Sequence, residues 1–133
     1  KGITLVEIMV SLGLIALLGG SILALLVENM RAGQTADYNY AAVNIAKSRI
    51  DRVRQLRRDK GFSYLYTAAE TDSTVDRNGL PDAEGEFTRS TSITQNFESN
   101  PNLTKVEVTV KYKASGDIST TSITLTSLMS PYI

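Results

Sequence analysis

Hydrophobic residues are arranged in two different ways along the N-terminal half of the chain. The run from Ile8 to Val27 contains no charged residue, and as a helix it would span roughly 30 Å, the thickness of a bilayer's hydrocarbon core. Further along, residues suited to one helical stripe recur at steps of three and four. These are Ala42, Ile45, Ala46, Ile50, Val53, Leu56 and Arg57. We therefore expect one helix from Ile3 to about Lys60, apolar in its first half and amphipathic in its second.

The C-terminal third of the chain has the alternating pattern of half-buried strands. From Lys105 to Lys113, every second residue is apolar or aromatic. Two more strands are expected from Phe87 to Phe97 and from Ile118 to Met129, where Ile118 is out of phase and predicts a bulge. A sheet with one apolar face needs a cover, and the amphipathic helix is the candidate. The pattern predicts an α+β domain with an antiparallel sheet of about three strands.

Turn signals divide these elements from one another. Gly61 follows a basic turn, as is typical of a helix end. The stretch from Asn78 to Asp82 has turn chemistry, so residues 61–86 are expected to form a loop. Further turns are expected at Asn100-Pro101-Asn102 and, as a hairpin, at Ser115-Gly116-Asp117.

Charge is balanced overall but unevenly distributed. Residues 47–60 hold seven basic and two acidic side chains, and residues 70–86 hold six acidic side chains and one basic. Their net charges of +5 and −5 would attract each other within one molecule or between neighbours. The alternative is a pair of solvated faces.

The composition argues against an enzyme. The chain has no histidine and no cysteine, no Gly-rich phosphate loop, and no serine nucleophile with a candidate base. No disulfide can form, and no cofactor is expected unless the acidic segment binds calcium.

Two binding chemistries stay open. Asp72, Asp76, Asn78 and Asp82 place several oxygen atoms in one segment, as calcium prefers, and a solvated acidic turn is the alternative. Residues 47–60 are basic, as nucleic-acid-binding segments are, but they lie on a helix whose other face packs and they lack interleaved aromatics. Nucleic acid is therefore not the expected partner.

The uncharged run is interpreted as a retained membrane anchor. A cleaved signal peptide has a shorter apolar core, and here apolar residues resume directly after Gly19-Gly20-Ser21. Lys1 before the run places the N-terminus in the cytoplasm by the positive-inside rule. Glu7 lies at the edge of the run, where a carboxylate is costly unless it is neutralised. We expect assembly to supply its partner, although a glutamate solvated among headgroups is the alternative.

The N-terminal sequence resembles the type IV pilin and pseudopilin superfamily. The resemblance lies in Gly2 followed by Ile3-Thr4-Leu5-Val6-Glu7, and it covers Lys1 to Val27. It implies that a prepilin peptidase cleaves after Gly2 and methylates the new amine on Ile3. It also implies that Glu7 pairs with the N-terminal ammonium of a neighbouring subunit. Phenylalanine or methionine is commoner at the position of Ile3, which is a mild departure.

A second departure concerns the middle of the apolar run. Many family members carry a proline there, whereas this chain has none before Pro81. Gly19-Gly20 is the weakest helical point available, and it would provide either a bend or a place where helices approach closely. We favour close packing.

The C-terminal strand pattern and the absence of cysteine look like V-type minor pilins and I-type minor pseudopilins. The resemblance implies a leader remnant (1–2), a transmembrane and filament-core helix (3–27) and a pilin-like globular domain (28–133) comprising a helix (28–60), a loop (61–86) and a sheet (87–129). The implied function is that of a structural subunit of a type IV pilus or a type II secretion filament. Major pilins and DNA-binding minor pilins of competence systems are the alternatives.

The resemblance also implies a location and partners. The subunit would be stored in the inner membrane as a single-pass protein with its C-terminal domain periplasmic or extracellular, and would then join the filament. Its partners would be other pilin or pseudopilin subunits, the prepilin peptidase and an inner-membrane assembly platform.

Overall fold

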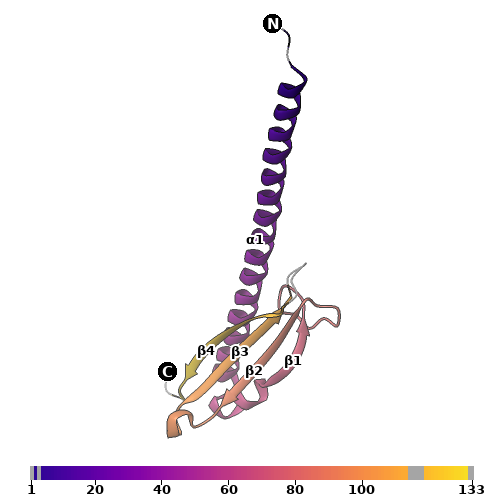
Figure 1. Cartoon of the computed structure of the whole chain (residues 1–133). Helices are drawn as coiled ribbons and strands as arrows, with labels where there is room; N and C mark the ends of the chain where they lie inside the picture. The colour runs from indigo at the N-terminus through magenta and orange to yellow at the C-terminus, as the bar shows by residue number, and fades with distance from the viewer. Residues whose placement is uncertain (1, 3, 114–118, 132–133) are drawn as a thin grey trace. The chain divides into compact units, whose positions relative to one another are not determined.

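The computed structural model describes residue 2, residues 4–113 and residues 119–131. In chain order, the elements are α1 (Leu5–Lys60), the 3-10 helix η1 (Phe62–Ala68), β1 (Glu70–Val75), β2 (Phe87–Thr94), the 3-10 turn η2 (Phe97–Ser99), β3 (Thr104–Tyr112) and β4 (Thr121–Met129) (Figure 1). The chain divides into two compact units, Lys1–Ala36 and Asp37–Ile133. The second half of α1 belongs to the C-terminal unit together with the sheet.

The predicted helix is confirmed, and its end has a local cause. The backbone N–H of Gly61 donates to the carbonyl of Arg57 at 2.9 Å. Gly61 itself has φ +93°, a conformation that side-chain-bearing residues rarely adopt. The glycine therefore allows the chain to leave the helix directly after Lys60, as the sequence predicted.

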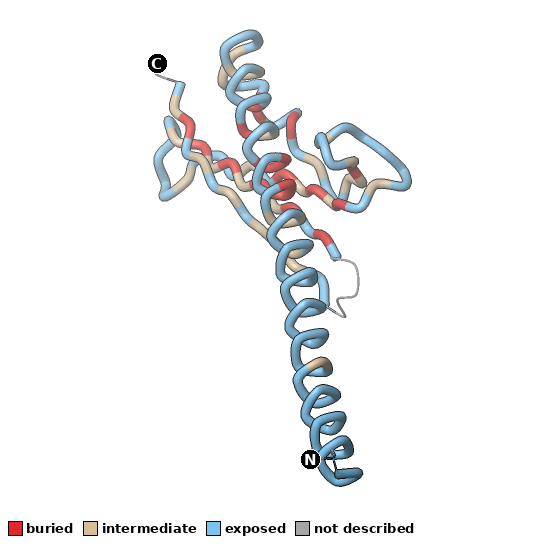
Figure 2. Tube along the Cα trace, turned by 90° about the horizontal axis from the view of Figure 1, so that it is seen from above, coloured by how far each residue is buried: buried red, intermediate tan, exposed pale blue. Residues whose placement is uncertain are grey.

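The core of the C-terminal unit lies between α1 and one face of the sheet. The helical stripe from Ala42 to Val53 is buried, and Figure 2 shows the buried positions of α1 confined to its second half. From the sheet, Phe87 on β2 and Val108 on β3 are fully buried, and Leu65 of η1 closes the cluster. The amphipathic pattern thus covers the apolar sheet face, which confirms the α+β fold class.

The sheet is an antiparallel meander in the order β1-β2-β3-β4. Val108 in the third strand pairs with Thr91 of β2 and with Leu125 of β4. These three strands are the ones that the sequence predicted, and the expected turn at residues 100–102 joins β2 to β3. The hairpin predicted at 115–117 and the bulge predicted at Ile118 lie outside the described residues.

A fourth strand, β1, forms where the sequence predicted only a loop. Residues 62–68 are helical and residues 70–75 pair with β2, so the predicted loop is confined to residues 76–86. Along β1, only Val75 is buried, because this edge strand has no hydrophobic alternation. Its register shifts between Glu70 and Ser73, with Asp72 at φ +46°. Backbone pairing and polar contacts hold β1, and neither leaves a periodic signal in the sequence.

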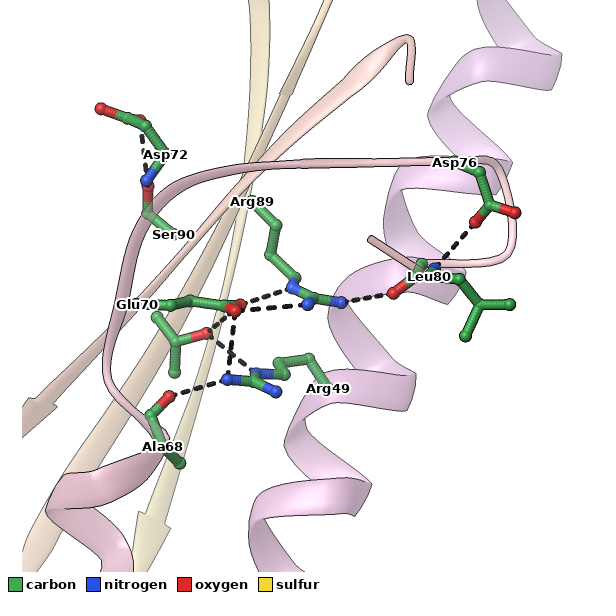
Figure 3. Close-up of polar contacts among 10 residues, drawn as sticks. Arg49, Ala68, Glu70, Asp72, Asp76, Leu80, Arg89 and Ser90 are labelled. Atoms are coloured by element: carbon green, nitrogen blue, oxygen red, sulfur yellow. Dashed lines mark hydrogen bonds and ion pairs between the residues drawn. The ribbon is translucent and has the colours of Figure 1, made fainter. Parts of the chain in front are cut away.

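The strongest polar contacts of β1 converge on Glu70 (Figure 3). Its carboxylate accepts hydrogen bonds from Nε of Arg89 at 2.5 Å and from Oγ1 of Thr91 at 3.0 Å. It also forms an ion pair with Arg49 of α1 at 3.2 Å. Both arginines also donate hydrogen bonds to backbone carbonyl groups. Arg49 donates to the carbonyl of Ala68 and Arg89 donates to that of Gly79, each at 2.8 Å. One carboxylate therefore links the helix, two strands and the loop.

The surroundings of Glu70 decide its ionisation. Burial alone would raise its pKa, but the hydrogen bond from Arg89 and the charges of Arg49 and Arg89 outweigh burial and lower the pKa below its ordinary value of 4.5. Arg49 also joins the basic segment 47–60 to the acidic segment 70–86. The attraction expected between the two segments is therefore present within the chain at this point.

We predict that Glu70→Gln destabilises the C-terminal unit by about 2 kcal/mol at neutral pH, because two partly buried guanidinium groups lose their counter-charge. Since the folded-state pKa of Glu70 lies below its unfolded-state value, its stabilisation is present above about pH 4.5 and is lost as the pH falls through the folded-state pKa. Urea unfolding of the full chain, followed by near-ultraviolet circular dichroism at several pH values, measures both effects.

Glu107→Gln is the matched control, because Glu107 forms its ion pair with Lys105 on the other sheet face. It should cost well under about 1 kcal/mol. The same acid-induced loss of stability in wild type and Glu70→Gln would contradict the assignment.

Candidate functional site

The N-terminal unit consists of a helix whose apolar side chains lack protein neighbours. From Leu5 to Met30, every large hydrophobic side chain is at least 50% exposed. Among the described residues, this is the helix that is long and apolar enough to cross a membrane. Soluble monomers rarely leave so large a continuous apolar surface in water. The surface is therefore compatible with a single membrane span or with packing against other helices.

The first turn of α1 is organised by Thr4, which directly precedes the helix. The Thr4 carbonyl accepts the N–H groups of Glu7 at 3.0 Å and Ile8 at 3.3 Å. Its hydroxyl also accepts the Glu7 N–H at 3.4 Å. Thr4-Leu5-Val6-Glu7 matches the sequence pattern of a capping box, and the structure shows its threonine half, in which the Thr4 hydroxyl accepts the Glu7 N–H. This pattern is recognisable in the sequence, although it was not among the features predicted from it.

Polar groups along the apolar segment are largely satisfied within the helix. The Ser11 hydroxyl donates to the carbonyl of Glu7 at 2.7 Å, and the Ser21 hydroxyl donates to that of Leu18 at 2.8 Å. The Glu7 carboxylate is different, because it accepts no hydrogen bond from any residue that the structure describes. It shares a helix face with Ser11 and Ile15, one and two turns later. Whether another chain supplies a partner for this carboxylate stays a prediction of the sequence.

Small residues form a second feature of the same segment. Ala16, Gly20 and Ala24 follow one another at intervals of four, which places them on one helix face. A Cβ added at Gly20 would meet no atom within 4 Å, and the same holds at Gly19. Stripes of this kind allow two membrane helices to approach closely. The contacts within the chain therefore do not require glycine at either position.

The predicted cleavage site is described only in part. Gly2 is exposed, and nothing lies within 4 Å of a Cβ built on it. Ile3, the residue expected to carry the methylated amine, and Lys1 lie outside the described residues. The expected processing at this bond stays a prediction.

Of the four residues proposed as calcium ligands, Asn78 and Asp76 are hydrogen-bonded to each other at 3.2 Å, whereas Asp72 has other partners. Asp76 accepts the N–H groups of Leu80 at 2.8 Å and Asn78 at 2.9 Å, so these two backbone donors fix its carboxylate. The hydrogen bond from Leu80 is the main cause that lowers the pKa of Asp76. Asp72 is engaged elsewhere, with Ser90 (Figure 3). It also accepts a hydrogen bond from Lys111 at 3.4 Å. Asp82 accepts the N–H of Glu84 at 3.0 Å.

Within the described ranges, no group of three or more acidic, histidine or cysteine side chains is placed to hold a metal ion. Asp76 and Asp82 accept backbone N–H groups within the loop that follows β1. Calcium binding by this segment stays a prediction of the sequence.

The basic segment of α1 divides between internal contacts and solvent. Arg49 joins Glu70, Arg54 pairs with Asp51 at 3.0 Å, and Arg57 donates to the carbonyl of Ser130 at 2.8 Å. Lys47, Arg52 and Arg58 line an exposed hollow of the helix surface together with Asn44, Ser48, Asp51 and Gln55. None of these lining residues is aromatic, so this surface lacks a platform on which bases would stack.

Comparison of the chain with protein-family models, with curated proteins and with solved structures gave no match. The features that bear on function are therefore the exposed apolar helix and the residues at its start. A long N-terminal apolar helix whose second half packs on a small antiparallel sheet is compatible with a pilin fold.

Proposed function

We propose that this chain is a structural subunit of a filament of the type IV pilus or type II secretion kind, specifically a minor pilin or pseudopilin. In this proposal the chain is cleaved after Gly2 and assembles through its N-terminal helix. The observation that carries the proposal is the Glu7 carboxylate, unpaired among the described residues, at the start of an exposed apolar helix. The exposed apolar segment and the pilin-compatible fold agree with it.

In the proposed life of the subunit, the N-terminal helix passes from one environment, lipid, to another, the interior of a filament. In lipid, the apolar surface of residues 8–27 is satisfied, and Glu7 lies near the headgroups. In a filament, the same surface would be buried against copies of itself, which favours assembly because apolar area leaves contact with water. A carboxylate in that dry interior is costly unless an opposite charge meets it. The amine released by cleavage after Gly2 would be that charge.

The processing step is tested by the intact mass and N-terminal fragmentation of the protein isolated from its native membrane. We expect a chain that begins at Ile3 and carries one added methyl group on its amine. A mature chain that retains residues before Ile3 would overturn the proposal, because the backbone nitrogen of Ile3 would then be an amide and not the ammonium that is proposed to pair with Glu7.

The pairing of Glu7 is tested by Glu7→Gln. The cap runs from the backbone N–H of residue 7 to the Thr4 hydroxyl, so this variant preserves the helix start and removes the charge. We expect normal membrane insertion and normal cleavage, but at least a tenfold loss of incorporation into filaments, consistent with a few kcal/mol for an uncompensated charge in a dry interior. Immunoblots of sheared filament fractions, normalised to membrane fractions, measure the ratio.

Glu28→Gln is the matched control, because Glu28 lies on the same helix beyond the apolar segment. It should incorporate normally. If Glu7→Gln incorporates normally while Glu7→Ala does not, Glu7 acts as a helix cap, and the charge-pairing argument fails.

The small-residue stripe gives a second test of assembly. Gly20→Leu should leave the isolated subunit intact, because the added side chain meets open space and leucine favours helix more than glycine does. It should nevertheless reduce incorporation severalfold, because neighbouring helices could no longer approach at this face. Gly19→Leu places the same side chain about 100° around the helix, off the stripe, and should be better tolerated. Equal incorporation of both variants would exclude the stripe as a packing face.

A further inference from the structure

A pocket of about 380 Å³ opens in the C-terminal unit between η1 and the connection from β2 to β3. Both segments lie at the end of the sheet where α1 also ends (Figure 1). Its volume falls within the range of small-molecule sites, roughly 300–1,000 Å³. The described residues that line it are Phe62, Ser63, Tyr66, Gln95, Asn96, Pro101 and Thr104. Phe62 packs on the core and Thr104 is buried, whereas Tyr66, Gln95 and Asn96 are exposed at the pocket.

The chemistry of the lining is mixed and uncharged. One wall carries two aromatic rings, of which Tyr66 is 60% exposed. The connection between β2 and β3 contributes the amides of Gln95 and Asn96, each with donor and acceptor atoms. None of the described lining residues is charged, so an ionic ligand would lose its hydration without a counter-charge. The lining suits a neutral ligand that has both an apolar face and several hydroxyl groups.

The wall that bears the amides is fixed in an unusual backbone conformation. Asn96, Glu98 and Ser99 have φ values of +53°, +53° and +62°. Left-handed conformations are costly for residues other than glycine and persist where surrounding contacts impose them. The Phe97 N–H donates to the carbonyl of Leu103 at 2.9 Å, and the Lys105 ammonium lies 5.5 Å from the centre of the Phe97 ring. These contacts define the backbone path of the connection, from which the exposed side chains of Gln95 and Asn96 project beside the pocket.

We propose that this pocket binds a neutral sugar unit, a hexose or N-acetylhexosamine. A sugar ring has a face of C–H groups that would stack on Tyr66 and hydroxyls that would meet the amides of Gln95 and Asn96. The uncharged lining favours a neutral sugar over a sialic acid or a sugar phosphate. The pocket uses residues of the C-terminal unit alone, so the proposal is independent of how the N-terminal helix functions.

The test uses the full chain in a detergent whose headgroup carries no sugar. Saturation-transfer difference NMR with glucose, galactose, mannose and N-acetylglucosamine, each at millimolar concentration, reports binding and identifies the sugar protons in contact. We expect at least one of the four to bind with its C–H face most strongly saturated. Tyr66→Ala should raise its Kd roughly five- to tenfold, through loss of the stacking surface.

Two variants separate the pocket from unspecific contact. Asn96→Gly removes the amide and keeps a residue that adopts the left-handed conformation readily, so it should weaken binding severalfold without disturbing the fold. Tyr64→Ala removes an exposed tyrosine that does not line the pocket and should leave the Kd within twofold. Absence of binding by all four sugars overturns the proposal. Equal losses in Tyr64→Ala and Tyr66→Ala also overturn it.

Discussion

The C-terminal unit depends on the burial of one helical stripe against one face of a four-stranded sheet. Ile45 and Val53 of α1 are each 1% exposed, and they meet fully buried valines of β3. Each such side chain contributes about 1.5–3 kcal/mol when removed from water, more than an exposed ion pair typically does. The Glu70 cluster depends on this packing as well. Arg49 lies at the margin of the stripe, so its stem is covered while its guanidinium reaches the carboxylate.

The first half of the same helix obeys a different constraint. Its apolar residues surround the whole circumference, so no single packing face could bury them. The helix satisfies its own backbone, and Ser11 and Ser21 return their hydroxyls to it, as a segment surrounded by hydrocarbon requires. Either lipid or other apolar helices can surround such a segment. The two environments differ mainly in whether they provide an opposite charge for Glu7.

The sequence predicted the features that large burial imposes and missed those set by single polar contacts. The stripe on α1 and the alternation in β3 follow from period and burial, so both were recognisable. β1 was missed because the ion pair of Glu70 with Arg89 and the pairing with β2 define it, and neither is periodic. The separation of Asp72 from Asp76 depends on the path of the chain, which spacing does not determine. The Thr4–Glu7 capping pattern was readable, whereas the pocket combines segments about thirty residues apart.

The free energies that Glu7 contributes at the helix start and in the proposed assembly differ in size. A carboxylate near a helix N-terminus contributes about 0.3–1 kcal/mol. In the membrane-stored form that the proposed function assumes, this contribution offsets part of the modest cost of a charge near the headgroups. Inside a bundle of apolar helices, the cost of that charge rises to several kcal/mol, beyond what the helix start supplies. Under the proposed function, the same residue is therefore tolerated in the membrane and demands an ammonium in the filament, and this difference would favour the one axial register that provides it.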